Sequence, residues 1–395
     1  MGLIINQDKV TKEIAKELID ICPFAALEMN GSELVANEGC KACKVCVKKG
    51  PSGVCEWVDE PKGPTVNKDE WRGIAVFAQQ HKGKVHPVSL ELVGKAKELA
   101  SVINHPVYAV IIGNDIDACA NELLQYGVDK VFVYDNLAFD EFVITPYTNA
   151  FTHFIQTIKP SSILVGATVL GRSLAPKVAA RVHSGLTADC TILKMKENTD
   201  LVQIRPAFGG NIMAQIITPD TRPQFCTVRY KIFDAPQKVE PFGEVISMEI
   251  PADQLKGDTQ VLDVKPLPEE IDISDADVIV ACGRGVKTQD DLSMAKELSE
   301  ALGAQMACTR PLIENGWFDP RRQIGLSGRT VKPKLIVCLG VSGSVQFAAG
   351  MNSSEKIIAV NSDPNANIFD IAHEGFVGDI YEIVPELINK IREAK

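Results

Sequence analysis

From about residue 67 to the end of the chain, short apolar runs alternate with stretches of helical pattern, which limits the fold more than any other feature. The first series of runs reads IAVFAQ, VYAVIIG, KVFVYD and SSILVGAT, and a second series reads ADVIVACGRGV, PKLIVCLGVSG and KIIAVNSD. Such runs are typical of strands that are buried on both faces, and the helical stretches between them supply the crossovers that parallel strands need. The sequence therefore predicts an α/β architecture with parallel sheets.

Two proline-bearing passages mark the domain boundaries. DEPKGPTVNKDEW follows a cysteine-rich head, and FGEVISMEIPADQLKGDTQVLDVKPLPEE separates the first series of strands and helices from the second. A chain of 395 residues is too long for one compact core. We predict a ferredoxin-like α+β head over residues 1–66, an α/β domain over 67–255 whose later part is rich in strands, and a doubly wound α/β domain over 256–395.

The charge balance restricts the kinds of partner. The chain has 41 basic and 51 acidic residues and a net charge of -10, whereas binding to a phosphate backbone needs a basic face. The sequence contains no apolar run near the roughly 20 residues that span a bilayer, and its first residues lack the apolar segment of a signal peptide. We expect a cytoplasmic protein with no nucleic-acid or membrane partner, in which disulfides are disfavoured.

Eleven cysteines are unevenly distributed, and five of them lie in the first sixty residues. The other six stand mostly in apolar, strand-like runs, where cysteine behaves as a small core hydrophobe. The clustered five are Cys22, Cys40, Cys43, Cys46 and Cys55, and the scattered six are Cys119, Cys190, Cys226, Cys282, Cys308 and Cys338. The cluster in the head therefore needs a separate explanation.

The C-x2-C-x2-C spacing of Cys40, Cys43 and Cys46 suits three corners of a [4Fe-4S] cluster. In ferredoxins with paired motifs, the fourth cysteine is followed by proline and binds the other cluster, and Cys22-Pro23 has this form without three cysteines before it. We predict a ferredoxin-like head that has lost one cluster, with the helix DKVTKEIAKELID in place of its binding loop and Cys22 as the fourth ligand. Cys55 is the alternative fourth ligand, and a tetrahedral zinc site is the alternative to iron.

Four lysines accompany these cysteines, in a stretch without acidic residues. They are Lys41, Lys44, Lys48 and Lys49. They are either solvated loop charges or a docking face for an acidic electron carrier.

Two turns in the last predicted domain have the chemistry of a phosphate cradle. Gly283 and Gly285 follow an apolar run and flank Arg284, so that a ligand can approach the backbone closely next to a positive charge. The run LIVCL leads into a second turn with two glycines and two serines before a helical stretch, whose first N-H groups can meet an anion. Neither turn is G-x-G-x-x-G, and either alone could be a tight connection. In a doubly wound domain both would lie at the carboxyl ends of the strands.

Several long motifs resemble the electron transfer flavoprotein alpha subunits. ACGRGV, ACTRPLIENGWF, RRQIGLSGRTVKPKLIVCLGVSGSVQFAAGM and KIIAVNSDPNANIFDIAHEGFVGDIYEIVPELI resemble the FAD-binding domain of this family, and GRSLAPKVAARVHSGLTADC with IRPAFGGNIMAQIITPDTRPQ resembles its first domain. The resemblance extends over roughly residues 70 to 395. The cysteine-bearing head is an extension found in some members only.

The resemblance implies an FAD site with a role for each matching position. Arg284 would neutralise the pyrophosphate, Thr309 and Arg310 would lie beside the flavin ring, and the Ser327 hydroxyl would lie near flavin N5. Ile324, Gly325 and Leu326 would line the ring together with Ser327. The ribityl and phosphate region would be held by Ser342, Gly343, Ser344, Val345, Gln346 and Phe347, and the adenosine half by Asn361 and Asp379; Ile380 is a further expected cofactor-binding residue.

Some positions depart from the family pattern. Phe347 stands where the family often has a histidine that supplies a hydrogen bond or a positive charge near the flavin, and phenylalanine can supply neither. Leu326 for glutamine and Ser327 for threonine are milder changes. The potential of the flavin is therefore the property that these departures put in question.

The implied function is electron transfer, with the redox chemistry in cofactors rather than in acid or base side chains. The sequence has no G-x-S-x-G or H-E-x-x-H motif, so we predict no catalytic side chain. The partners would be a beta subunit whose flavin is reduced by NADH, a flavin-dependent dehydrogenase, and ferredoxin, which the [4Fe-4S] head would serve in electron bifurcation. The alternatives are a carrier that does not bifurcate and a binding module with a structural zinc site.

Overall fold

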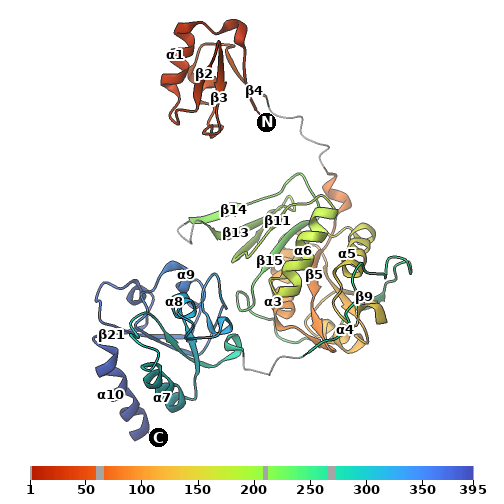
Figure 1. Cartoon of the computed structure of the whole chain (residues 1–395). Coiled ribbons are helices and arrows are strands. Elements are labelled where there is room, and N and C mark those ends of the chain that lie inside the picture. The colour runs from red at the N-terminus through yellow and green to blue at the C-terminus, as the bar shows by residue number, and fades with distance from the viewer. Residues whose placement is uncertain (1, 59–65, 208–211, 266–271, 395) are drawn as a thin grey trace. The chain divides into compact units, whose positions relative to one another are not determined.

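The computed structural model describes residues 2–58, 66–207, 212–265 and 272–394 (Figure 1). The chain divides into two compact units, Met1–Thr65 and Val66–Lys395, and each is described by itself. Parts of both proline-bearing passages, residues 59–65 and 266–271, lie outside the described residues, as do residues 208–211 of the family motif IRPAFGGNIM. The three-domain division predicted from the sequence therefore stays a proposal.

The head has the element order β-α-β-β-α-β, which is the ferredoxin-like order. Strand β1 pairs antiparallel with β4, and β2 and β3 form an antiparallel hairpin. Helix α1 begins after Thr11, whose hydroxyl accepts a hydrogen bond from the Ile14 N-H, and it buries Ala15 and Leu18 against Leu34. The elements are β1 (Gly2–Ile5), α1 (Lys12–Ile21), β2 (Leu27–Asn30), β3 (Glu33–Ala36), α2 (Val45–Lys49) and β4 (Cys55–Val58).

The second unit begins with a seven-stranded parallel sheet of order β11-β15-β10-β5-β8-β9-β16. Its strands are β5 (Ile74–Ala78), β8 (Val107–Gly113), β9 (Lys130–Asp135), β10 (Ser162–Gly166), β11 (Leu186–Thr187), β15 (Gln224–Val228) and β16 (Glu244–Ser247). All five residues of β5 are buried, because helices cover both faces of the sheet. Helices α3 (Pro87–Ile103) and α4 (Asp117–Leu124) cover one face, and α5 (Ile144–Ile158) and α6 (Val169–Arg181) cover the other. The predicted α/β class with parallel sheets is confirmed.

The strand-rich stretch predicted within this domain forms a separate antiparallel sheet. Its order is β12 (Ile192–Met195), β13 (Leu201–Ala207) and β14 (Ile212–Ile216). Leu193 and Leu201 are fully or almost fully buried in the same core as helix α3, so this sheet is packed onto the domain. A short hairpin of β6 (Gln80–His81) and β7 (Lys84–Val85) follows β5.

The last part of the chain forms a five-stranded parallel sheet of order β18-β17-β19-β20-β21. Its strands are β17 (Val278–Cys282), β18 (Gln305–Cys308), β19 (Leu335–Leu339), β20 (Lys356–Asn361) and β21 (Glu374–Val377), and its helices are α7 (Leu292–Leu302), α8 (Arg310–Glu314), α9 (Val345–Ala348) and α10 (Ile380–Glu393). Helices α7 and α10 lie together on one face of the sheet (Figure 1). The strand order reverses between β17 and β19, and such a switch point is where open α/β sheets bind ligands.

The six cysteines outside the head are core residues, as predicted. Each is at most 1% exposed. Cys282, Cys308 and Cys338 lie side by side on β17, β18 and β19, where Cys282 is the register partner of Cys308 and Cys338 that of Ala281. Burial raises the pKa of the Cys282 thiol to about 12, so it is protonated at neutral pH. These thiols are packed among the buried side chains, as their apolar surroundings in the sequence predicted.

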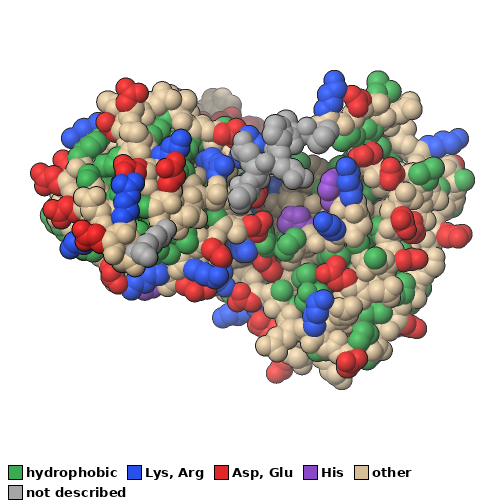
Figure 2. Space-filling model, turned by 90° about the horizontal axis from the view of Figure 1, so that it is seen from below, with side chains coloured by type: hydrophobic (Ala, Val, Ile, Leu, Met, Phe, Trp, Pro, Cys, Tyr) green, Lys and Arg blue, Asp and Glu red, His purple; other side chains and the backbone are tan. Residues whose placement is uncertain are grey.

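The surface charge is mixed. On the face drawn in Figure 2, basic and acidic side chains are interspersed rather than gathered by sign. This distribution fits the acidic net charge of -10 and lacks, on that face, the continuous basic surface that a nucleic acid requires. Within the part of the chain that the structure describes, no helix combines the length and the apolar character needed to span a bilayer.

One buried carboxyl group supports the end of strand β15. Glu91 on α3 is 7% exposed, and its two carboxyl oxygens accept hydrogen bonds of 3.2 and 3.0 Å from the Lys231 N-H. Lys231 has a φ of 67°, a left-handed conformation that costs free energy outside glycine. Burial raises the pKa of Glu91 to about 8 despite these hydrogen bonds. The carboxyl group therefore titrates in the neutral range.

We expect Glu91→Gln to flatten the pH dependence of stability. The folded pKa of about 8 lies above the value of 4.5 for a free glutamate, so between the two the native state holds a proton that the unfolded chain releases. The free energy of unfolding therefore falls as pH rises through this window, by up to about 1.4 kcal/mol per pH unit from this group. Urea unfolding at several pH values within the window measures the slope. An equal slope in the variant and the unaltered chain would contradict this assignment.

Candidate functional site

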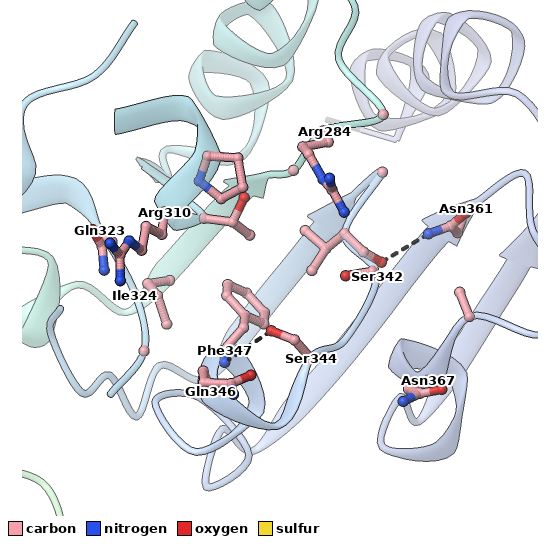
Figure 3. Close-up of a pocket in the computed structure, with 18 of the residues that line it drawn as sticks. Arg284, Arg310, Gln323, Ile324, Ser342, Ser344, Gln346, Phe347, Asn361 and Asn367 are labelled. Carbon is pink, nitrogen blue, oxygen red and sulfur yellow. Dashed lines mark hydrogen bonds between the residues drawn. The ribbon is translucent and has the colours of Figure 1, made fainter. Parts of the chain in front are cut away.

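A cavity of about 1040 Å³ lies at the carboxyl ends of strands β17 to β20. Its wall includes the turns that follow β17, β18 and β19 and the loop that follows β20. Figure 3 shows Arg284 and Ser342 at one side of the cavity and Arg310, Gln323 and Ile324 at the other. The cavity spans the switch point between β17 and β19, which is where the doubly wound pattern predicted a ligand.

Three glycines form the floor where the turns after β17 and β19 meet. A Cβ atom on Gly283 would lie 2.4 Å from the Gly340 carbonyl oxygen, and one on Gly285 would lie 2.5 Å from the Gly340 Cα. Gly340 has a φ of 59°, so glycine is favoured there for conformational reasons as well. The backbone of Gly285 also donates a hydrogen bond of 3.0 Å to the Gly340 carbonyl. The two turns therefore pack against each other without side chains between them, and all three glycines line the cavity.

Polar groups surround this cradle. Arg284 is exposed between the two glycines, and Ser342 and Ser344 are exposed in the turn after β19. The Asn361 Nδ2 donates a hydrogen bond of 2.8 Å to the Val341 carbonyl, which ties the turn to the end of β20. The Ser344 Oγ accepts a hydrogen bond of 3.4 Å from the Phe347 N-H at the start of α9. This side of the cavity therefore offers a guanidinium and hydroxyls, groups that bind phosphate oxygens.

A tight loop, Gln323 to Arg329, forms the opposite wall. The Arg329 N-H donates to the Gln323 carbonyl at 2.7 Å, and the Gly325 N-H donates to the Arg329 carbonyl at 3.1 Å. The Leu326 N-H donates to the Gln346 carbonyl at 2.9 Å, which joins the loop to α9. Gly325 has a φ of 131°, and a Cβ there would lie 2.8 Å from the same Gln346 carbonyl oxygen. We call residues 323–329 the wall loop.

Arg229, at the end of β15, also contacts the wall loop. Its guanidinium donates hydrogen bonds to the carbonyls of Gly325 and Gly328, at 3.3 and 3.5 Å, and to the Leu326 carbonyl. It also pairs with Asp189 at 2.8 Å. Burial alone would raise the pKa of Asp189, but Arg229 and Arg172 outweigh burial and hold this pKa below its usual value. The ionised carboxylate therefore balances the charge of Arg229 next to the wall loop.

Thr309 and Arg310 begin α8 beside the wall loop. The Thr309 N-H donates to the Cys282 carbonyl at 3.0 Å, which fixes Thr309 at the end of the sheet. The Arg310 Nε pairs with Glu314 at 2.8 Å, and both side chains are more than half exposed. Arg310 thus lines the cavity while its charge is partly balanced by a carboxylate on the same helix.

The structure brings most of the predicted FAD residues together. Twelve of the sixteen line the cavity: Arg284, Thr309, Arg310, Ile324, Gly325, Leu326, Ser327, Ser342, Ser344, Gln346, Phe347 and Asn361.

The other four predicted residues lie outside the wall of the cavity. Asp379 caps α10, with its carboxylate accepting a hydrogen bond of 3.0 Å from the Tyr381 N-H. Ile380 is 3% exposed in the core beneath α10. Gly343 is packed against Ile368, and the side chain of Val345 is 40% exposed. In this structure these four residues therefore have capping, packing or surface positions.

Several residues of the wall were not predicted as FAD ligands. They are Gly283, Gly285, Pro311, Gln323, Gly340, Val341, Asp363, Asn365, Ala366 and Asn367. The two turns were recognised as a cradle, but their glycines were not included among the FAD ligands. The stretch of Asp363 to Asn367 had a usable signal, because turn residues directly follow a parallel strand at its carboxyl end. Gln323 had none beyond its place next to Ile324.

A second, much smaller cavity lies in the head. It has a volume of about 20 Å³, and all four predicted ligands, Cys22, Cys40, Cys43 and Cys46, line it. Its other walls are largely apolar and include Leu27 and Trp57. In residues 2–58, as elsewhere in the described chain, no three His, Cys, Asp or Glu side chains lie close enough together to hold a metal ion. The thiols therefore share a cavity without converging on one point.

Backbone geometry around these thiols is unusual. Ala42 and Lys44, the residues before Cys43 and between Cys43 and Cys46, have φ values of 54° and 62°. Left-handed conformations at non-glycine residues cost free energy and are often associated with functional sites. The Cys22 Sγ accepts a hydrogen bond of 3.3 Å from the Ala26 N-H. Hydrogen bonds to sulfur of this kind also tune iron-sulfur clusters.

Cys55, the alternative fourth ligand, lies outside this cavity. It is 4% exposed in the head core, where it contacts the cluster of side chains around Leu18 and Leu34. Burial, followed by the charge of Cys46, raises the pKa of the Cys55 thiol to about 11. Of the two candidates for the fourth ligand, Cys22 lines the cavity, whereas Cys55 is hydrogen-bonded to Cys46 outside it.

Comparisons with known proteins agree with the architecture of the second unit. Residues 74–253 match the family described as the electron transfer flavoprotein domain, and residues 272–352 match the electron transfer flavoprotein FAD-binding domain. The lactate dehydrogenase (NAD(+),ferredoxin) subunit LctC of Acetobacterium woodii is 59% identical over 391 residues, which cover 99% of this chain and 93% of that protein.

Two further relatives match a smaller share of this chain. The electron transfer flavoprotein subunit alpha of Thermoanaerobacterium thermosaccharolyticum is 38% identical and matches 83% of this chain and 100% of its own length. The corresponding subunit of Megasphaera elsdenii is 40% identical and matches 82% and 98%. The resemblance predicted from the motifs is confirmed. The chain belongs to the electron transfer flavoprotein alpha subunit family.

Proposed function

We propose that this chain holds FAD in the cavity at the ends of β17 to β20 and passes electrons between a partner flavin and a flavin-dependent dehydrogenase. The observation that carries the proposal is the cavity at the switch point, whose two turns pack backbone to backbone, because a Cβ on Gly283 or Gly285 would collide with the backbone of Gly340. When bound, FAD supplies the one- and two-electron chemistry. The residues of this chain would bind and orient it and tune its electrostatic environment.

The distribution of polar groups supports one orientation of FAD. Arg284, Ser342 and Ser344 offer a charge and hydroxyls for the pyrophosphate at one side of the cavity. Thr309, Arg310 and the wall loop would lie beside the flavin ring, with Ile324 as an apolar contact. Phe347 is 4% exposed and forms part of the core beneath the cavity, where it offers no hydrogen bond. The ring would therefore depend on neutral donors such as Ser327.

The proposal for the head is a [4Fe-4S] cluster bound by Cys22, Cys40, Cys43 and Cys46. It is supported by the common cavity of these four thiols and by the hydrogen bond from Ala26 to the Cys22 sulfur. A volume of about 20 Å³ holds roughly one water, so a cluster would require the loop from Cys40 to Lys44 to open. That loop forms no helix or strand, so opening it would break no hydrogen bonds of regular secondary structure. Metal binding commonly completes a site that is not preformed.

The relatives support a link to ferredoxin. The match to LctC covers 99% of this chain and so includes the head, whereas the two alpha subunits match 83% and 82%. The name of LctC contains NAD(+) and ferredoxin. We therefore propose that this chain pairs with a beta subunit that takes electrons from NADH, and that the head serves ferredoxin in electron bifurcation. The name also favours lactate as the substrate of the partner dehydrogenase, whose own pocket would select it.

Three exposed lysines support a docking face on the head. Lys41, Lys48 and Lys49 are exposed near the cysteine cavity, and the Lys44 ammonium lies 4.6 Å from the ring centre of Trp57. Positive charge near a redox centre accelerates association with an acidic carrier. This arrangement favours ferredoxin over a neutral partner.

Gly285→Ala tests the FAD cavity. The added methyl group would lie 2.5 Å from the Gly340 Cα, a backbone atom that cannot rotate away. We expect FAD affinity to fall by more than about tenfold and stability to fall by about 1–3 kcal/mol. Titration of the apoprotein with FAD, followed by absorbance, measures the affinity.

Gly303→Ala is the matched control for Gly285→Ala. Gly303 ends α7 with a φ of 66°, and among the described residues no atom lies within 4 Å of the position that a methyl group would take there. Alanine at this position is strained but leaves the cavity unchanged. It should lower stability by about 1 kcal/mol and leave FAD affinity unchanged. Equal FAD affinities for Gly285→Ala and Gly303→Ala would refute the cradle.

Cys40→Ala and Cys55→Ala together test the metal site. Anaerobic purification with the beta subunit should give about four irons per chain. We expect Cys40→Ala to lose its iron and keep FAD, whereas Cys55→Ala keeps both, because Cys55 lies outside the cavity. Metal and FAD quantitation provides the measurement. Zinc without iron would refute the [4Fe-4S] cluster and indicate a structural zinc site. Loss of iron from Cys55→Ala would identify Cys55, rather than Cys22, as the fourth ligand.

Charge reversal tests the docking face. Changing Lys41, Lys48 and Lys49 to glutamate should slow ferredoxin reduction by about tenfold at low ionic strength, and the difference should shrink as salt is added. The matched control reverses Lys9, Lys12 and Lys16, three exposed lysines in or just before α1. Stopped-flow reduction of ferredoxin by the assembled complex gives the rates. Equal slowing by both sets would indicate a general charge effect and contradict a local docking face.

A further inference from the structure

Gln323 is the first residue of the wall loop, and its buried side chain contacts a hydroxyl of the same loop that lines the cavity. It is 7% exposed, and its Nε2 donates a hydrogen bond of 2.7 Å to the Ser327 Oγ. Both residues line the cavity, but Ser327 is exposed there while Gln323 is buried. A buried amide therefore donates its hydrogen bond to an exposed hydroxyl within one short loop.

The wall loop does not need this bond to close. Its backbone is already held by the reciprocal hydrogen bonds of Arg329 with Gln323 and Gly325, at 2.7 and 3.1 Å. The Leu326 N-H donates a hydrogen bond to the Gln346 carbonyl, and the Gly328 N-H donates one of 2.9 Å to the Gly325 carbonyl. Arg229 adds hydrogen bonds to three carbonyls of the loop. The side chain of Gln323 therefore has its main effect on the hydroxyl rather than on the path of the backbone.

The direction of the bond determines what the hydroxyl can do. A serine hydroxyl has one proton to donate and two lone pairs that accept, whereas an amide nitrogen only donates. Because the Ser327 oxygen accepts a hydrogen bond from the Gln323 Nε2, the serine hydroxyl cannot also donate its proton to that nitrogen. The proton is left for a partner in the cavity. The group that fits there is an acceptor, such as a ring nitrogen or carbonyl of a flavin.

We propose that Gln323 is a positioning residue that directs the Ser327 hydroxyl as a donor toward the flavin ring. The inference rests on the proposed FAD site and goes beyond it, because it concerns a residue that does not itself bind the ring. A hydrogen bond to a charged acceptor is stronger than one to a neutral acceptor. The directed hydroxyl therefore favours added electron density on the ring and makes the midpoint potential of bound FAD more positive.

A double-mutant cycle tests this role. The variants are Gln323→Met, which keeps the length of the side chain without its amide, Ser327→Ala, and the two combined. In the unaltered background, Gln323→Met should weaken FAD binding about three- to tenfold and lower the midpoint potential. In the Ser327→Ala background, the same change should alter FAD affinity by less than about twofold, because the hydroxyl it acts on is gone. Affinity comes from FAD titration of the apoprotein, and potential from anaerobic spectroelectrochemistry.

The outcomes separate this role from others. Equal effects of Gln323→Met in both backgrounds would mean that Gln323 contacts the flavin itself, and no effect in either would remove its role; both results overturn the proposal. If Gln323→Met fails to fold, Gln323→Glu replaces it, with the coupling to Ser327→Ala compared so that the added charge cancels. Ser327→Thr, which keeps the hydroxyl, should retain the native response to Gln323 substitution.

The cycle also separates this inference from the proposal on which it rests. If the unaltered chain binds no FAD, the proposed site fails. If it binds FAD and the cycle shows no coupling, only the role of Gln323 fails.

Discussion

The close approach of Gly285 to Gly340 is the contact on which the FAD cavity depends. Strands β17 and β19 are neighbours in register, with Cys282 opposite Leu339, so their following turns leave the sheet at the same height. The two turns then contact each other through their backbones, because a Cβ on either glycine would lie 2.5 Å from the Cα of the other. The two segments diverge after this contact. The one that follows β17 leads toward α7, and the one that follows β19 leads to α9. The cavity is the space between the diverging turns.

The wall loop depends on the same contact indirectly, through helix α9. The turn after β19 sets the start of α9, and the Gln346 carbonyl at that start accepts the Leu326 N-H. A change in the glycine contact would therefore shift both sides of the cavity together. Arg229 holds the loop from outside through its carbonyls, with Asp189 balancing its charge.

The sequence predicted those parts of the molecule that follow from local pattern. Buried runs such as Ile74–Ala78 identified parallel strands, and the glycines after β17 identified the cradle, because both depend on residue types at short spacing. Arg229 and Gln323 were not predicted, since their roles arise from hydrogen bonds to groups whose positions only the fold determines. Asp379 illustrates a position with two possible roles. An aspartate before a helix is a good cap, and in the structure it caps α10, while its predicted contact with the adenosine half stays a prediction.

The guanidinium groups that line the proposed ring position or contact the wall loop, Arg310 and Arg229, are each paired with a carboxylate of this chain. Arg310 pairs with Glu314, Arg229 pairs with Asp189, and the Phe347 side chain carries no charge. A paired guanidinium exerts a weaker field at a distance than a free one, because the carboxylate charge opposes it. Neutral dipoles at contact distance then decide how the ring responds to added electrons. A hydroxyl that is held as a donor by a buried amide is such a dipole, and it does not change its protonation over the physiological pH range. The potential of this flavin should therefore be set by hydrogen-bond direction more than by nearby charge, which makes it insensitive to salt.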